Sequence, residues 1–228
     1  MMHEGTDSFI NMFEERYEMI RKLSSIIVAG VLLSCNCRFI FLPYVAALLS
    51  IWGGKLLSRK LWRRTLVYFP LVLAIAVDRP HFSINVWEIV LSTLVGFFLL
   101  LLFIKELKVI FSKTVREFLP EVRPGLFYQE AVFIYSSAVI EEIFFKGFML
   151  YRLSHFGMLS IVAVSFLFTF LHWINTDPAR VKDHIAQFVM MFCTGLLFYF
   201  TNSVIGCILC HCIYGTPYAV KLYFQAKK

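Results

Sequence analysis

The sequence predicts an all-α integral membrane protein that crosses the bilayer several times. Of its 228 residues, 59% are hydrophobic and 25 are Phe, and the mean hydropathy is +0.73. A soluble domain is nearer half apolar, so this excess indicates that lipid surrounds the protein. The apolar residues also fall into successive stretches of membrane-helix length. Both observations favour a polytopic helical fold.

We expect about eight transmembrane helices. They are predicted at residues 20–37, 39–57, 65–77, 86–104, 128–151, 157–173, 185–201 and 203–220. The first two are separated by almost no loop, because Arg38 lies between them, and the third is short for a span. No cleavable signal peptide is expected, since the first twenty residues carry five acidic side chains.

The basic residues predict the orientation. With the N-terminus inside the cell, 18 of the 22 Lys and Arg residues fall in cytoplasmic segments. Arg38, Arg79 and Arg152 fall outside, and Lys146 lies within a span. This positive-inside distribution accounts for the net charge of +7 without nucleic acid. We therefore expect a multi-pass protein of the cell membrane, in contact with lipid, with both termini cytoplasmic.

The chain divides at one clear boundary, residues 105–126. In this segment apolar residues recur at helical spacing between basic ones until Pro120 and Pro124 break the pattern. It is expected to be an amphipathic helix on the cytoplasmic surface. It separates a transmembrane half, residues 1–104, from a second half, residues 127–228, that holds most of the buried polar side chains.

The six cysteines are best interpreted as small packing residues, because nearly all lie inside predicted spans. The stretch "CILCH" (207–211) fits a haem-attachment pattern, but that chemistry needs an accessible segment and this one is apolar. A zinc site on the same helix is disfavoured too, since Cys210, His211 and Cys212 project in different directions.

Two adjacent glutamates, Glu141 and Glu142, interrupt the predicted span 128–151. Glu142 and Lys146 are one helical turn apart, so an ion pair can form between them, which makes both charges tolerable in a membrane. Glu141 lies about 100° further around the helix, on the face that holds the small residues Ser137 and Ala138. Small residues let another helix approach. Glu141 is therefore expected to point at protein or at a water-filled cavity.

Two histidines, His172 and His211, lie in two other predicted spans. A single membrane histidine is usually a hydrogen-bonding partner between helices. Two histidines and a glutamate on three separate spans indicate more, because Glu and His can deprotonate water or hold a metal that does so. The sequence alone leaves a structural polar network, or a proton relay in a transporter, as alternatives.

The order and spacing of these residues resemble those of the CPBP (Abi) family of intramembrane proteases, named for CAAX-protein processing and bacteriocin processing or self-immunity. The family's E-E-x-x-x-R motif reads Glu141-Glu142-Ile-Phe-Phe-Lys146 here. Its F-x-x-x-H motif reads Phe168-Thr-Phe-Leu-His172, followed by the Asn175 found in many bacterial members. The third motif supplies His211. The resemblance covers about residues 127–220 and favours a bacterial plasma membrane.

The resemblance implies an intramembrane endopeptidase with its catalytic core in the last four helices. Glu141 would be the general base, with His172 assisting it, and His211 would hold the water or stabilise the oxyanion. Phe168 and Asn175 would support the site. No cofactor is expected in a glutamate-type enzyme, whereas in a metalloprotease Glu141, His172 and His211 would hold zinc. The substrate would be a membrane-associated peptide or small protein, including prenylated ones, and a homo-oligomer is compatible with this interpretation.

Two departures from the family pattern keep an alternative open. Lys146 replaces an Arg, which keeps the charge but loses the planar fork of donors. Gly215 stands where the family has Asn or Asp, so a side-chain donor is missing from the expected oxyanion hole, a loss that typically costs about 10²–10³ in rate. The alternative function is therefore a catalytically impaired member that acts as a membrane binding or regulatory scaffold.

Overall fold

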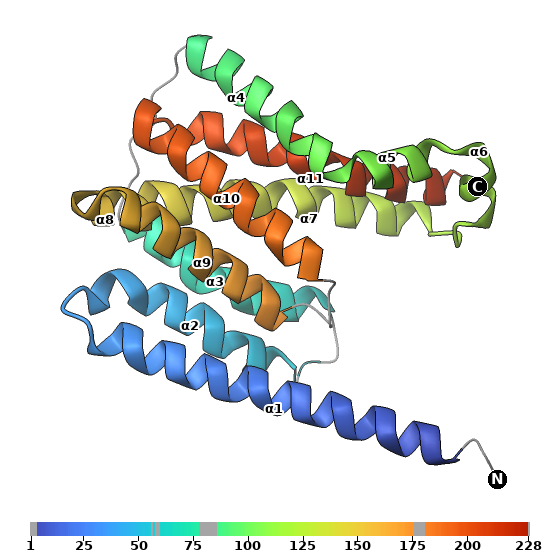
Figure 1. Cartoon of the computed structure of the whole chain (residues 1–228), viewed down its shortest axis with the longest axis horizontal. Coiled ribbons are helices and arrows are strands. Elements are labelled where there is room, and N and C mark those ends of the chain that lie inside the picture. The colour runs from blue at the N-terminus through green and yellow to red at the C-terminus, as the bar shows by residue number, and fades with distance from the viewer. Residues whose placement is uncertain (1–3, 56, 58–59, 78–85, 176–180, 228) are drawn as a thin grey trace. The chain divides into compact units, whose positions relative to one another are not determined.

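The computed structural model describes residues 4–55, 57, 60–77, 86–175 and 181–227, and most of these residues are helical. No strand occurs in these ranges, so the all-α prediction is confirmed; Arg79 lies outside the described residues. The elements, labelled in Figure 1 where there is room, are α1 (Glu4–Ser34), α2 (Arg38–Gly54), α3 (Lys60–Val77), α4 (Val86–Leu100), η1 (Leu101–Phe103), α5 (Ile104–Phe111), α6 (Lys113–Phe118), α7 (Pro124–Glu142), η2 (Ile143–Leu150), α8 (Tyr151–Leu153), η3 (Ser154–Phe156), α9 (Met158–Asn175), α10 (Val181–Thr201) and α11 (Val204–Ala226).

Backbone contacts divide the chain into two compact units. The first comprises residues 1–70 with 174–176, and the second comprises residues 71–173 with 177–228. These units are defined by backbone contacts alone. The predicted division into residues 1–104, 105–126 and 127–228 is therefore not tested by them and stays a prediction. All but one of the residues expected at the site belong to the second unit; Asn175 is grouped with the first.

In the first unit, α1 and α2 form a helical hairpin. Residues 35–37 connect the two helices, whereas the sequence predicted Arg38 alone between them, and Arg38 is instead the first residue of α2. Arg38 N–H donates to Cys35 O at 3.0 Å in this turn. At the other end of the hairpin, Lys55 forms an ion pair with Glu18, and this hydrogen-bonded ammonium lowers the pKa of Glu18. The two helices are therefore joined at both ends.

In the second unit, α11 is the central helix. It packs against α4, α7 and α10 and also contacts α5 and η2, and Figure 1 shows it between α4 and α7. Near its C-terminal end, Val122 N–H donates to Gln225 O at 3.1 Å, and the rings of Phe127 and Tyr223 lie 5.9 Å apart. Helices α7 and α11 are thus antiparallel, which brings the end of α7 beside the first half of α11.

Small residues allow the helices of the second unit to pack closely. A β-carbon on Gly96 of α4 would lie 3.0 Å from Ile213 of α11. A β-carbon on Gly206 of α11 would overlap Ser92 Oγ of α4, and one on Gly195 of α10 would lie only 2.7 Å from Ile161 of α9. Such close approach is typical of helix contacts in membranes. These contacts fix the helices that carry the histidines.

The segment 105–126 differs from the single amphipathic helix expected there. It forms two short helices, α5 and α6, separated at Ser112, whose ψ of 125° is extended. Leu119 is extended as well, at ψ 137°, and Pro120 follows it. An extended residue cannot continue a helical hydrogen-bond ladder, so one continuous helix is interrupted here.

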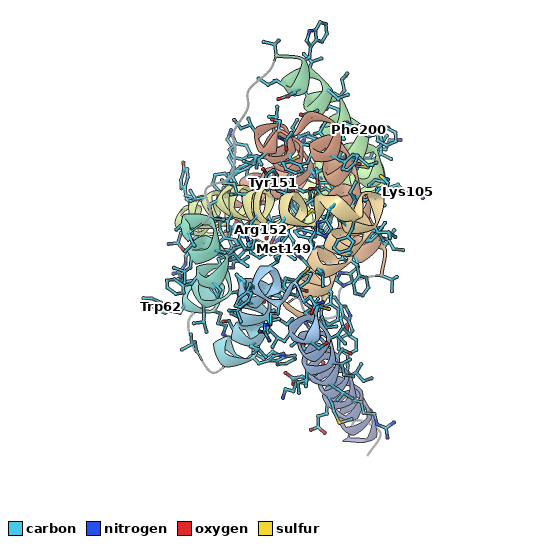
Figure 2. All side chains as sticks on the ribbon, turned by 90° about the vertical axis from the view of Figure 1, so that its left-hand side faces the viewer. Trp62, Lys105, Met149, Tyr151, Arg152 and Phe200 are labelled. Carbon is cyan, nitrogen blue, oxygen red and sulfur yellow. The ribbon has the colours of Figure 1, made fainter. Side chains whose placement is uncertain are left out.

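The span expected at 128–151 changes its helix type in the middle. Helix α7 continues directly into η2, a π-helix in which Tyr151 N–H donates to Lys146 O, five residues earlier. Seven of the eight residues of η2 are buried. Figure 2 includes Met149 from this segment, which is fully buried, and the neighbouring Tyr151, which is 55% exposed. The wide turn begins immediately after the Glu141-Glu142 pair.

Three described helices, α9, α10 and α11, are long and apolar enough to cross a membrane. Helices α2 and α4 are apolar but shorter. Large apolar side chains are exposed on these helices, including Leu159 and Phe166 on α9 and Phe200 on α10, and exposed apolar surface of this extent is typical of a membrane contact. Helices lie over all eight expected ranges, but the count of eight spans is not confirmed.

Candidate active site

Three helices bring Glu141, His172 and His211 together. Glu141 Oε1 lies 3.7 Å from His172 Nε2, and Glu141 Oε2 lies 3.9 Å from His211 Nε2. The carboxylate therefore stands between two imidazoles that come from α9 and α11. Its side chain is 4% exposed, whereas that of His172 is 23% exposed, so the cluster is reached from the side of His172.

The ring of His172 is oriented by Phe168, one turn earlier on α9. His172 Nδ1–H donates to Phe168 O at 3.1 Å, and because a carbonyl can only accept, this bond assigns the hydrogen to Nδ1. The Phe168 ring lies 4.2 Å from the imidazole and is itself packed against Phe145 at 5.3 Å. Nε2 of His172 is consequently the nitrogen that faces Glu141.

The ring of His211 is oriented by Glu142. His211 Nδ1 lies 2.9 Å from Glu142 Oε1, and an ionised carboxylate only accepts, so Nδ1 donates and Nε2 faces Glu141. The adjacent glutamates thus have different tasks. Glu141 faces both histidines through their Nε2 atoms, and Glu142 fixes one of those histidines from behind.

Lys146 compensates the charge of Glu142. Its Nζ lies 3.6 Å from Glu142 Oε2, and both side chains are fully buried. Within the described part of the chain Oε2 has no hydrogen-bond partner, so its interaction with the ammonium is electrostatic. Lys146 Nζ also contacts Met191 Sδ of α10. The expected ion pair is present, and it extends into a chain that runs from Met191 through Lys146 and Glu142 to His211.

This arrangement suits the activation of a water molecule. In their neutral forms, both Nε2 atoms are acceptors, as is the carboxylate, and 3.7–3.9 Å is longer than a direct hydrogen bond. A water molecule between these groups can donate to Glu141 and to one imidazole. A carboxylate with two imidazoles in reach can therefore deprotonate water and keep its oxygen oriented.

The same donor types are those that zinc prefers. Within the ranges that the structure describes, however, no three His, Cys, Asp or Glu side chains are grouped so that they could hold a metal ion. The triad as arranged is thus wider than a coordination shell.

Comparison with known protein families matches residues 124–216 to the model described as type II CAAX prenyl endopeptidase, Rce1-like. This model is one of the CPBP family, and the segment that it matches is less than half of the chain. The matched segment contains Glu141, Glu142, Lys146, His172 and His211, and the predicted resemblance is confirmed. No curated protein and no solved structure matches the chain.

Asn175 and Gly215 are two further positions of the CPBP pattern. Asn175 is the last residue of α9 and is exposed. Gly215 lies on α11 one turn beyond His211, where a β-carbon would meet Ile134 Cγ2 of α7 at 3.2 Å. A side chain at 215 therefore has little room, because α7 packs closely against this face.

Cys207 of α11 lies near the Glu142–Lys146 ion pair and is not part of the triad. Cys207 is fully buried and donates from Sγ to Thr194 O at 3.2 Å, and Thr194 Oγ1 donates to Met191 O at 3.1 Å. All six cysteines are free. Cys207 and Cys210 are buried, as a packing role predicts, whereas Cys35 is exposed. Cys207 joins α11 to Thr194 of α10, which is bonded to Met191, the residue that contacts Lys146.

Sequence reasoning missed three contributors to this site. Met191 carries no recognisable signal, since one Met in an apolar helix is ordinary. The bond between Glu142 and His211 links residues 69 positions apart, which no local pattern records. The π-helix gives no periodic signature either, because its apolar residues are buried on all sides.

Proposed function

We propose that the protein is an intramembrane endopeptidase that cleaves a membrane-associated peptide or protein, with prenylated CAAX-type peptides as the first substrates to test. The match to a CAAX prenyl endopeptidase family supports the reaction class. The observation that carries the proposal is the Glu141 carboxylate between two imidazole Nε2 atoms, at 3.7 Å and 3.9 Å.

In the proposed reaction Glu141 is the general base. It removes a proton from water while the water oxygen bonds to the scissile carbonyl carbon, whose oxygen becomes an oxyanion. His172 Nε2 accepts the second hydrogen of the water and so orients it. His172 is the more exposed histidine, which places it on the side from which water and substrate enter.

His211 is assigned to the oxyanion. Nδ1–H of His211 donates to Glu142, so a second proton of the ring would be carried on Nε2. This Nε2–H would then donate to the oxyanion as its negative charge develops. When the intermediate collapses, the C–N bond breaks and the proton held by Glu141 passes to the leaving amine. The products are an amine and a carboxylic acid, which releases its remaining proton to solvent and becomes a carboxylate, and Glu141 is regenerated.

The metal-free route is our proposal, and zinc bound by Glu141, His172 and His211 is the alternative. Zinc would supply a Lewis acid and a more acidic water. Metal analysis of the purified protein separates the two routes. Full activity at less than about 0.1 metal per chain supports the first. Activity that disappears with a chelator and returns with zinc overturns it.

The cell-level role follows from the same chemistry. Maturation of a bacteriocin or signal peptide, self-immunity, and processing of prenylated proteins all require cleavage at a membrane. The family resemblance favours a bacterial plasma membrane as the location, and the basic-residue distribution favours cytoplasmic termini. A homo-oligomer is compatible with the proposal and is not required by it, since the triad comes from one chain.

The deciding experiment measures cleavage of fluorogenic farnesylated and unmodified peptides by the protein in lipid nanodiscs. Glu141→Gln should reduce kcat/KM by about 10² or more, because the base is removed. The matched control is Glu121→Gln, an exposed glutamate in the connection before α7, which should behave as wild type. Equal activity of both variants would exclude Glu141 as the base.

A non-catalytic scaffold is the second candidate, and Gly215 favours it because the family's side-chain donor is missing there. This function predicts that a bound peptide survives intact. Mass spectrometry of peptides recovered from the wild-type protein, after incubation in H₂¹⁸O, separates the two. A fragment with ¹⁸O in its new carboxylate supports the peptidase, and full recovery of uncut peptide supports the scaffold.

A further inference from the structure

The second unit contains a cavity of about 590 Å³ that the catalytic proposal does not use. It lies between α5, α6 and the ends of α10 and α11, and neither Glu141 nor the two histidines line it. Much of its wall is apolar and includes Ile110, Leu119 and Pro217. Its size is that of a typical ligand site.

Three lysines from three different helices line this cavity. They are Lys105 of α5, Lys182 of α10 and Lys221 of α11, and Figure 2 includes Lys105. None of the described residues that line the cavity is acidic. The nearest acidic group on α10 is Asp183, which acts electrostatically on Tyr214 and does not line the cavity. The lining therefore carries a strong positive charge next to an apolar wall.

We propose that this cavity binds an anionic phospholipid. The phosphate group would interact with Lys105, Lys182 and Lys221, and the acyl chains would lie along the apolar wall. Basic pockets between membrane helices bind anionic headgroups in this way. The basic-residue distribution places all three lysines in cytoplasmic segments, and the cytoplasmic leaflet carries negative surface charge.

The apolar wall distinguishes a lipid from a small anion. Inorganic phosphate would use the lysines alone, whereas a lipid uses both parts of the cavity. Gly215 lies in the lining as well, so the cavity is adjacent to α11 one turn from His211. The proposal concerns binding and is independent of whether the protein cleaves peptides.

The test uses the full-length protein in neutral detergent and measures its thermal unfolding. Phosphatidylglycerol is the probe, and phosphatidylcholine and inorganic phosphate are the comparisons. At about 100 times the Kd, phosphatidylglycerol should raise the Tm by about 5–10 °C, and the other two should not. Replacement of Lys105, Lys182 and Lys221 by Gln should abolish this shift.

The matched control removes three other lysines from the same part of the chain, by Lys108→Gln, Lys113→Gln and Lys227→Gln. They are exposed and do not line the cavity, so this variant should keep the shift. Its loss in both triple variants would mean that general surface charge binds the lipid, which overturns the proposal. An equal shift with phosphatidylcholine or with phosphate alone overturns it too.

A second variant keeps the test valid if the lysine triple variant does not fold. Val115→Trp fills the cavity from α6 without a change of charge, and it should remove the phosphatidylglycerol shift in a folded protein. Native mass spectrometry should then find a phosphatidylglycerol molecule on the wild-type protein and none on this variant. A lipid retained by Val115→Trp would place the binding site elsewhere.

Discussion

His211 donates from Nδ1 to Glu142 Oε1 over 2.9 Å, and this bond joins α11 to the end of α7. The other oxygen of the same carboxylate interacts with Lys146 at 3.6 Å. Glu142 is thus connected to a buried cation and to a site histidine at once. Stability and catalytic alignment therefore depend on one side chain.

Glu142→Gln should destabilise the protein strongly. The amide oxygen can still accept from His211, but the amide carries no charge, so Lys146 becomes an uncompensated buried cation. Breaking a buried ion pair from one side typically costs about 3–5 kcal/mol. The measurement is thermal unfolding in detergent together with folded yield, and both should fall more than the specific activity of the remaining folded protein.

The double variant Glu142→Gln with Lys146→Met tests the reason for that loss. It removes the unpaired cation and replaces it with an apolar chain of similar length, so part of the stability should return. A double variant that is as unstable as the sum of the two single variants would show that the ion pair is not the source of the effect.

His172→Gln should affect activity much more than stability. The side chain is partly exposed, and its removal costs the hydrogen bond to Phe168 O, about 1 kcal/mol. We expect kcat/KM to fall by about 10²–10⁴. His155→Gln in η3, an exposed histidine, is the control. Equal kinetics for the two variants would refute the role of His172.

Lys146→Arg, which restores the residue of the family pattern, should destabilise this protein. Met191 Sδ contacts Lys146 Nζ in a fully buried position, so the larger guanidinium has no room, and overpacking typically costs about 1–3 kcal/mol. Met191→Ala should relieve the cost in the double variant. If Lys146→Arg alone unfolds at the wild-type temperature, Met191 does not restrict this site.

Gly215→Asn tests the missing donor. If that donor alone limits the rate, activity should rise by about tenfold, which corresponds to about 1.4 kcal/mol. Ile134 must move first, because a β-carbon at 215 would lie 3.2 Å from its Cγ2. Ile134→Ala in the same chain makes that room, and Gly215→Ala controls for the β-carbon. Loss of a clear wild-type activity in Gly215→Asn with Ile134→Ala would refute the oxyanion account of this helix.

Local spacing was enough to predict part of the site. Glu142 and Lys146 are four positions apart, and helical geometry brings such residues together without knowledge of the fold. The helical fold could be predicted as well, because it follows from the hydropathy pattern. The match of residues 124–216 to the protease family agrees with the motifs that carried the resemblance.

Contacts between helices that are distant in the sequence could not be predicted from local spacing. The partner of His211 depends on the antiparallel contact of α7 with α11, and the steric limit at Gly215 depends on Ile134 in that same contact. The break at Ser112 replaced one amphipathic helix by two. The lysine cavity was not predicted, because Lys105, Lys182 and Lys221 are distant in the sequence. Each of them has the pattern of an ordinary cytoplasmic charge.

The ion pair of Glu142 with Lys146 and its hydrogen bond with His211 can form at different times during synthesis. Lys146 follows Glu142 by four residues, so this pair can form as soon as the helix enters the bilayer, and the charge of Glu142 is compensated before α11 is synthesised. His211 follows 69 residues later, about 3–14 s at ribosomal speeds of about 5–20 residues per second. The local pair therefore permits insertion of the helix, and the triad can be completed only after α11 has been synthesised.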